Sequence, residues 1–261
     1  MAERSFDGLR ILCYSPLVLA AESARKSDTL RHSAVVRATH WLTVIAFFAL
    51  LITGVEILIS HPRFYWGEVG NSTMQPLFSL HIPASRDTVP TGYKYTMPDQ
   101  NGWSRALHFQ AAWLLLFTGL IYGIAGFWSG HFRKDLVPGR RQRSWSAFRA
   151  VMAKTFRRGP PNGEQARSYN VVQRATYLIV IFVLFPLVIW TGLAMSPTFT
   201  GAFPWTASAL GGRQSARTLH FFITIALLLF VVVHIAMVYL AGFKCRMRAM
   251  ITGRAVEEER P

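Results

Sequence analysis

The sequence predicts an all-α integral membrane protein built around a four-helix transmembrane bundle. Of its 261 residues 51% are hydrophobic, and eight are tryptophan, which is too apolar for an ordinary soluble domain. Four runs reach the roughly 20 apolar residues that are needed to cross a hydrocarbon core about 30 Å thick. They cover residues 38–59, 106–128, 176–195 and 219–243. Each is expected to form one transmembrane helix.

The basic residues indicate how these helices are oriented. A net charge of +15 could suggest binding to nucleic acid, but Lys and Arg gather on alternate flanks of the apolar runs. Six precede the first run, eleven lie between His131 and Arg174, and five follow the fourth run. The positive-inside rule therefore places segment 1–37, loop 129–175 and tail 244–261 in the cytoplasm. Residues 38–243 form the membrane domain, and no nucleic-acid partner is expected.

Three segments outside the apolar runs carry further signals. The outer loop 60–102 has five prolines and begins with an aromatic cluster at 61–66, so it is expected to cap the outer end of the bundle. Within the inner loop, apolar residues at spacings of three and four over 145–156 predict an amphipathic helix on anionic lipid. Segment 11–21 has the length of a signal-peptide core. Cleavage there would place the basic loop 129–175 outside, against the positive-inside rule. A segment on the membrane surface, or a translation start assigned too far upstream, is therefore favoured.

The cysteines restrict how a cofactor could be held. Cys13 and Cys245 both fall on the predicted cytoplasmic side, where thiols stay reduced, so no disulfide is expected. The sequence has no Cys-x-x-Cys-His motif for covalent haem and no thiolate set for an iron–sulfur cluster. Any cofactor is therefore held noncovalently, by side chains such as histidine.

Three histidines open an apolar run, and each follows an arginine by three residues. The pairs are Arg37 with His40, Arg105 with His108, and Arg217 with His220. An i,i+3 pair lies on one helix face, so an imidazole that points into the bundle has a guanidinium beside it nearer the water. This arrangement suits haem, since imidazole can bind the iron while the planar fork of Arg binds a propionate.

The fourth apolar run carries a second histidine, His234, fourteen residues after His220. This spacing is close to four helical turns, so both share one face and stand about 21 Å apart along the axis. His40 and His234 both lie towards the inner side, while His108 and His220 lie towards the outer side. The sequence thus predicts two bis-histidine haems b stacked across the bilayer, with the fourth helix contributing to both.

Glycines in the helices support this arrangement, because a porphyrin between helices leaves little room for flanking side chains. Gly54 lies fourteen residues after His40, at the depth of the outer haem, and Gly119 lies eleven residues after His108, facing the inner one. Gly192 is a further candidate for the outer haem. The alternative is that these glycines only let the helices pack closely.

The histidines also have alternative explanations. They could be structural or form a proton relay in a transporter, but a relay usually recruits acids, and Glu56 is the one acidic residue in the apolar runs. The remaining histidines lie outside or at the ends of the runs, where surface or loop roles are favoured, with His131 the nearest competitor as a ligand. These four are His32, His61, His81 and His131.

The pattern resembles the bacterial cytochrome b561 and nickel–iron hydrogenase b-type cytochrome family over about residues 31–243. The residues that carry the resemblance are His40-Trp41, His108, and His220 with His234. The long outer loop, including residues 98–103, is similar to the branch of thiosulfate reductase cytochrome b subunits. The resemblance implies a protein of the bacterial cytoplasmic (inner) membrane that passes electrons between the quinone pool and a periplasmic partner, commonly a molybdopterin oxidoreductase. The resemblance places the haem ligands on His40, His108, His220 and His234.

Iron with two histidine ligands has no free coordination position, so these haems are expected to relay single electrons as part of a larger oxidoreductase. Glu56 lies near the outer end of the first run and could accept a proton from quinol, or it could pair with Arg63 or Arg105. Two alternatives stay open. One is a stand-alone b-type cytochrome that acts on a diffusible small molecule, and the other is a cofactor-free proton-coupled transporter.

Overall fold

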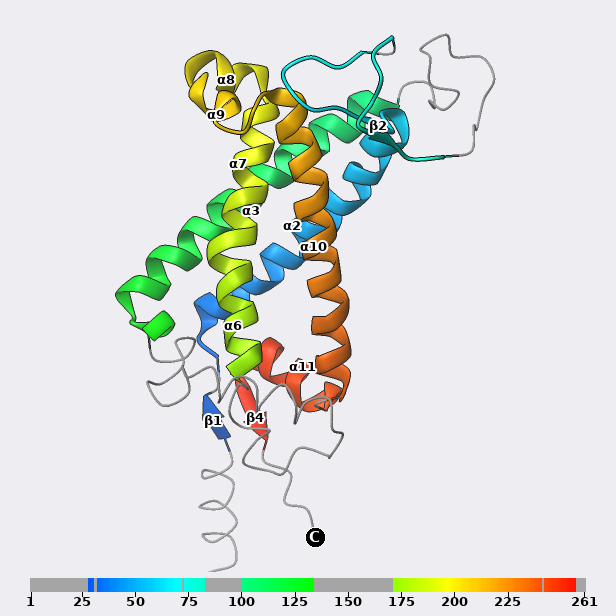
Figure 1. The fold of residues 1–261 in the computed structure, drawn as a ribbon. Coiled ribbons are helices and arrows are strands. Elements are labelled where there is room, and N and C mark those ends of the chain that lie inside the picture. The colour runs from blue at the N-terminus through cyan, green and yellow to red at the C-terminus, as the bar shows by residue number, and fades with distance from the viewer. Residues whose placement is uncertain are drawn as a thin grey trace, which may run out of the picture.

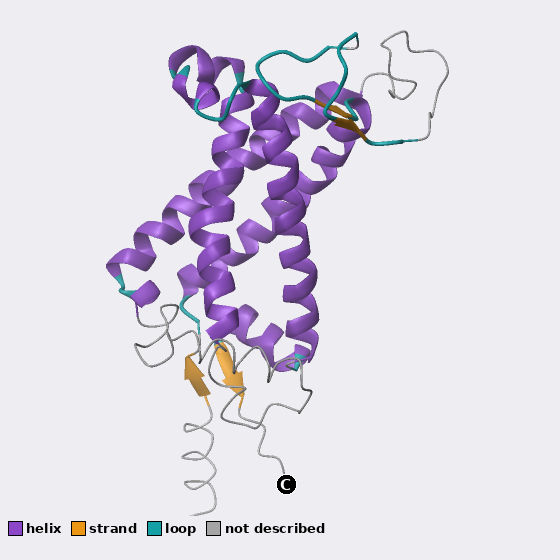
Figure 2. Ribbon diagram, in the orientation of Figure 1, coloured by secondary structure: helices purple, strands orange, loops and turns teal. Residues whose placement is uncertain are grey.

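A computed structural model describes residues 28–30, 32–71, 73–82, 100–133, 171–240 and 242–256. Four helices are long and apolar enough to cross a membrane, over Ala34–Ser60, Gly102–Trp128, Arg174–Met195 and Arg213–Tyr239. The predicted all-α membrane fold is confirmed (Figure 2). The predicted signal-like segment 11–21, Cys13 and the amphipathic helix over 145–156 lie outside the described residues.

The first two spans, α2 (Ala34–Ser60) and α3 (Gln100–Trp128), pack against each other as a hairpin. Their contact uses small residues at every seventh position, which lets the two backbones approach closely. Large side chains such as Ile45 and Ile52, both about 60% exposed, point away from this contact. The buried small residues are Thr39, Ala46, Thr53 and Ser60 on α2, and Ser104, Ala111 and Thr118 on α3.

The third span is one long helix with a wider turn in its middle. It consists of α6 (Val171–Ile179), a π-helical turn (Val180–Leu184) and α7 (Phe185–Met195). The N–H of Phe185 donates to the carbonyl of Val180, five residues earlier. Pro186 explains this turn, since proline has no N–H and its ring would collide with the carbonyl four residues before it. Helix α7 then packs along the fourth span, α10 (Arg213–Leu240).

The loop after α2, which the sequence predicts on the outer side, caps the N-terminus of α10. The two ends of the bundle are named inner and outer by this predicted orientation. The carbonyl of Gly67 accepts from the N–H groups of Gln214 (2.9 Å) and Ser215 (3.2 Å), which have no partners inside the helix. Gly212 has a φ of +111°, and a Cβ on it would lie 2.5 Å from the Gly67 backbone, so this close approach requires glycine. The loop therefore fixes where α10 begins, and with it the position of His220.

Two short strands and two short helices complete the outer end (Figure 1). Strands β2 (Arg63–Phe64) and β3 (Phe78–Ser79) pair antiparallel, and the Phe64 ring stacks on Phe78 with ring centroids 4.6 Å apart. Phe64 also packs on Phe221 of α10, at 4.7 Å between centroids. Helices α8 (Pro197–Ala202) and α9 (Trp205–Ser208) connect α7 to α10.

At the inner end, the segment before α2 meets the segment after α10. Strand β1 (Asp28–Leu30) pairs antiparallel with β4 (Arg254–Val256), next to α11 (Phe243–Thr252). The Arg37 guanidinium donates to the carbonyl of Ile251 (2.5 Å), and the Trp41 indole N–H donates to that of Met250 (3.1 Å). Helix α10 ends at Leu240, slightly before the predicted residue 243, because the chain turns at Gly242 with a φ of +95°.

The two helical hairpins cross obliquely. In Figure 1, α2 and α3 run at a marked slant to the more upright α6, α7 and α10. Close backbone packing is concentrated within each hairpin, between α2 and α3 and between α7 and α10. Between the hairpins, the ring of His40 on α2 lies near that of His234 on α10, and the ring of His108 on α3 lies near that of His220 on α10.

Candidate haem-binding sites

The inner site is formed by two histidines from different hairpins. His40 comes from the first turns of α2, and His234 from the inner half of α10. Their ring centroids lie 6.5 Å apart, with an angle of 51° between the ring planes. The Nδ1 atom of His40 is buried and has no hydrogen-bond partner among the described residues. The structure thus brings together the two residues that the sequence predicted as the inner pair.

The outer site has the same construction. His108 near the start of α3 faces His220 near the start of α10, with ring centroids 6.4 Å apart and 61° between the planes. Helix α10 therefore contributes one imidazole to each site. Their spacing of fourteen residues corresponds to an axial separation of about 21 Å.

The separation of the rings within each pair fits a metal held between two imidazoles. An imidazole nitrogen binds a transition metal at about 2.0–2.1 Å, and the ring centre lies roughly 1 Å further away, so two opposed ligands have centroids about 6 Å apart. The measured 6.4 and 6.5 Å agree with this value. Among the described residues no three His, Cys, Asp or Glu side chains gather into one cluster. Pairs of this kind suit an iron whose other positions are filled by a porphyrin.

The outer histidines have hydroxyl partners that the sequence reasoning did not identify. Thr53 Oγ1 on α2 lies 2.9 Å from His108 Nδ1, and Thr191 Oγ1 on α7 lies 2.9 Å from His220 Nδ1. Both threonines are buried, and each is followed by glycine. Recurrence of Thr-Gly inside the spans is a signal that could have drawn attention to them.

The glycines differ in what they contact. A Cβ on Gly54 would lie 3.6 Å from His108 Cε1, and one on Gly192 would lie 3.5 Å from His220 Cε1, so both glycines sit beside an outer imidazole. A Cβ on Gly119 would have no described atom within 4 Å. Gly54 is thus at the predicted depth, and the role of Gly119 towards the inner haem stays a prediction.

Two of the three predicted propionate-binding arginines meet at the outer end, around His61. Arg217 donates to the backbone carbonyls of Arg63 (3.2 Å) and His61, and it covers the Phe64 ring at 5.2 Å. The Arg105 guanidinium lies 3.4 Å from His61 Nε2. Burial, and then the positive charges of Arg217 and Arg105, lower the pKa of His61. His61 is therefore a neutral group between two cations. It makes closer contacts with the rest of the fold than the surface or loop role that the sequence predicted.

The third predicted arginine, Arg37, lies at the inner end and holds α11 through its hydrogen bond to Ile251. Glu56 is half-buried near the outer end of α2, and the structure shows no ion pair between it and any described residue, Arg63 and Arg105 included. His81 is exposed on the outer loop. His131 packs by its ring edge on Tyr122, with centroids 6.1 Å apart, away from both histidine pairs.

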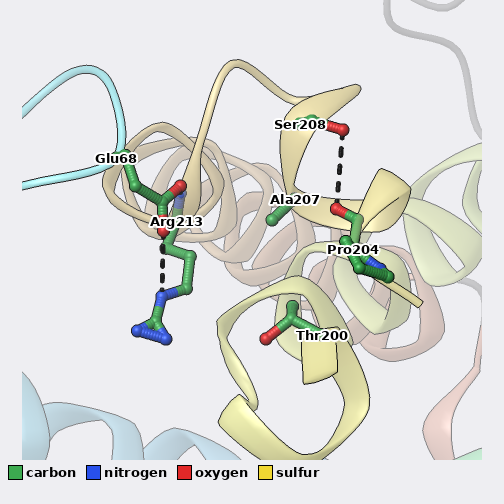
Figure 3. A pocket seen from close by; sticks show the side chains of 6 residues that line it. All are labelled: Glu68, Thr200, Pro204, Ala207, Ser208 and Arg213. Atoms are coloured by element: carbon green, nitrogen blue, oxygen red, sulfur yellow. Dashed lines mark hydrogen bonds and ion pairs between the residues drawn. The ribbon is translucent and has the colours of Figure 1, made fainter. Parts of the chain in front are cut away.

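A shallow hollow lies beyond the outer site, between the outer loop and helices α8 and α9 (Figure 3). One wall carries the ion pair of Arg213 Nε with Glu68 Oε1, at 3.2 Å, and the other carries Thr200 and Ser208. Both charged groups are largely exposed, so this pair contributes little to stability. The hollow is a surface feature separate from the histidines.

Four membrane helices with two facing imidazole pairs at different depths are the arrangement expected of a membrane cytochrome of the b type. The comparison with known families agrees, because the prokaryotic cytochrome b561 family matches residues 31–253. The chain belongs to this family, which confirms the resemblance seen in the sequence. It is a membrane electron-transfer protein, and its family implies b-type haem.

One similar protein comes from Azospira oryzae and is described as a putative protein-methionine-sulfoxide reductase subunit, YedZ1. It is 32% identical over 216 residues, which cover 80% of this chain and 90% of the relative. The match therefore covers most of both proteins. No solved structure matches the chain.

Proposed function

We propose that the protein is a dihaem cytochrome b of the bacterial inner membrane that carries electrons between the quinone pool and a periplasmic oxidoreductase of the molybdopterin type. The observation that supports this most directly is the sharing of α10 between two histidine pairs. Each pair lies at a different depth and joins two helices. Two such sites, about 21 Å apart along α10, would place two one-electron carriers at different depths of the hydrocarbon core.

Each residue in the sites has a definite task under this proposal. His40 with His234, and His108 with His220, would each hold one haem from both sides. Bound in this way, haem b supplies reversible one-electron chemistry and has no open position for oxygen or a substrate. Arg105 and Arg217, together with Arg37 at the inner end, would neutralise the propionates, and Gly54 and Gly119 would leave room for the porphyrins.

The relative supports the choice of partner. It is described as a subunit of a methionine-sulfoxide reductase, so electron transfer to a catalytic subunit is the role that the similarity favours. We propose that electrons run from quinol to such a partner, docked at the outer end. The basic inner flanks support this orientation, with both termini in the cytoplasm and the hollow beside Glu68 facing the periplasm.

Quinol oxidation also needs a proton acceptor near the outer haem. Glu56 is half-buried near the outer end of α2, and no described cation pairs with it. A carboxylate in that environment can accept a proton from a hydroquinone. We propose Glu56 for this role, with electrons entering at the outer site.

Haem content and quinol reactivity test the proposal. We expect the purified full-length protein to bind two haems b per chain, measured as the pyridine haemochromogen, and to be reduced by a soluble quinol analogue. Glu56→Gln should slow the reduction at unchanged haem content. Glu68→Gln is the matched control, because Glu68 is exposed at the same end and should leave the rate unaltered.

The opposing outcomes are specific. Folded, membrane-inserted protein without haem b would contradict the cytochrome function and favour the transporter alternative, and one haem per chain would contradict the dihaem arrangement. Equal rates for Glu56→Gln and wild type would remove Glu56 from the quinone site. Purification from native membranes in mild detergent without any companion subunit would favour the stand-alone cytochrome.

A further inference from the structure

The two outer imidazoles are held in the same way by two unrelated segments. On α2, Thr53 Oγ1 lies 2.9 Å from His108 Nδ1, and on α7, Thr191 Oγ1 lies 2.9 Å from His220 Nδ1. The side chains of both threonines are almost fully buried, with relative exposures of 0% and 1%. Bulk solvent does not reach either threonine, and the nearby imidazole nitrogen is a direct partner for each hydroxyl.

The direction of each hydrogen bond follows from the other contact of the hydroxyl. Thr53 Oγ1 donates to the carbonyl of Ala49 at 2.7 Å, and Thr191 Oγ1 donates to that of Leu187 at 2.8 Å. A hydroxyl has one proton, so once it is donated to the backbone the oxygen can only accept from the imidazole. Nδ1 therefore carries the proton in His108 and in His220, and Nε2 keeps its lone pair.

The inner pair has a different environment. The buried Nδ1 of His40 has no hydrogen-bond partner among the described residues. Thr39, the neighbour of His40, donates to the carbonyl of Val35 at 2.8 Å, but it has no recorded contact with an imidazole. Among the described residues, threonine hydroxyls lie beside the imidazoles of the outer pair only.

We propose that Thr53 and Thr191 are positioning residues that fix the tautomer of His108 and His220, so that both bind iron through Nε2, and that they lower the reduction potential of the outer haem. This proposal rests on the proposed function, since it needs haem at the outer site. The threonines do not touch the iron and act through the imidazoles. Groups of this kind orient a ligand and raise its basicity.

The sign of the effect follows from charge. A ligand N–H is a stronger donor when the iron carries the additional positive charge of the oxidised state, so its bond to the threonine oxygen favours that state. Removing the acceptor should therefore raise the potential of the outer haem. For each threonine we expect the ratio of reduced to oxidised haem at a fixed potential to rise about tenfold, which equals about 59 mV for one electron.

Isosteric variants of the full-length protein test this. Thr53→Val and Thr191→Val keep the volume of the side chain and remove the hydroxyl. Thr39→Val is the matched control, because Thr39 is buried on the same helix and makes the same bond to its own backbone. Thr53→Ser keeps the hydroxyl and removes only the methyl group. Spectroscopic redox titration and the EPR g-values of the oxidised haems are the readouts.

We expect the reduction potential of one of the two haems to rise in Thr53→Val and in Thr191→Val, with altered g-values. In Thr53→Ser the potential of that haem should stay near the wild-type value. Both haems should be unchanged in Thr39→Val. Selective loss of the outer haem in the valine variants would also support the proposal.

Unshifted potentials in both valine variants, an equal shift in Thr39→Val, or loss of both haems in both valine variants would overturn the proposal. If wild type lacks haem b altogether, the proposed function fails instead. Two haems in wild type with unmoved potentials in the variants would leave that function intact.

Discussion

The pairing of the four histidines makes a strict prediction about double variants. Ring centroids are 6.5 Å apart for His40 and His234 and 6.4 Å apart for His108 and His220, so each pair is one site. Replacing one histidine of a pair by alanine leaves a single ligand, and we expect haem content to fall from two per chain to one. Removing its partner as well should cost nothing more, because residues that act as a unit are not additive.

Two double variants show how much haem should be lost. His40→Ala with His234→Ala should retain one haem per chain, whereas His40→Ala with His108→Ala should retain none. Haem is measured as the pyridine haemochromogen relative to protein in detergent-purified samples that keep their helical circular dichroism. His81→Ala is the control, because His81 is exposed on the outer loop and should leave both haems in place.

The opposite pattern would refute this reasoning. If the double variant within the inner pair lost all haem while remaining folded, the two sites would not be independent. If the double variant across the pairs kept one haem, at least one of the four histidines would be misassigned.

Two further predictions concern stability. A Cβ on Gly126 would lie 2.5 Å from Cζ of the buried Phe132 ring, so Gly126→Ala should destabilise the protein by about 1–3 kcal/mol in detergent unfolding experiments, whereas Gly123→Ala, where a Cβ meets no described atom within 4 Å, should not. Equal stabilities would show that the ring moves aside freely. Burial and two nearby guanidinium groups lower the pKa of His61 in the folded protein. As the pH falls below the ordinary value of 6.5, the unfolded state therefore binds a proton before the folded state does, and the folded protein loses stability. Thermal unfolding between pH 7.5 and 5 should show a smaller loss for His61→Gln than for wild type, and parallel curves would count against this role.

The sequence allowed the spans and the histidine pairs to be predicted because both depend on simple regularities. Twenty apolar residues mark a crossing, and the alternating basic flanks fix which histidines share a depth. Thr53 and Thr191 were not predicted, because a threonine inside an apolar helix bonds to its own backbone wherever it lies. Thr118-Gly119 repeats the same dipeptide on α3 without a recorded contact to an imidazole, so the dipeptide alone does not identify the support.

The small-residue contact between α2 and α3 was also missed. Helix α2 is hydrophobic on every side, so its periodicity does not distinguish the lipid-facing side from the buried one. Size distinguishes them, since the buried positions on α2 are Ala, Ser and Thr while large side chains such as Ile45 and Ile52 are exposed. The end of α10 at Leu240 depends on the turn at Gly242, a backbone feature that the apolar run does not show.

The confinement of close backbone packing to the two hairpins bears on how the protein is assembled in the cell. α2 and α3 can insert and complete their contact while the rest of the chain is still being synthesised. The later hairpin supplies His220 and His234, and with them the second half of each site. Under the proposed function, haem would join the two hairpins within the membrane, in addition to the hydrogen bonds that join them at the outer and inner ends.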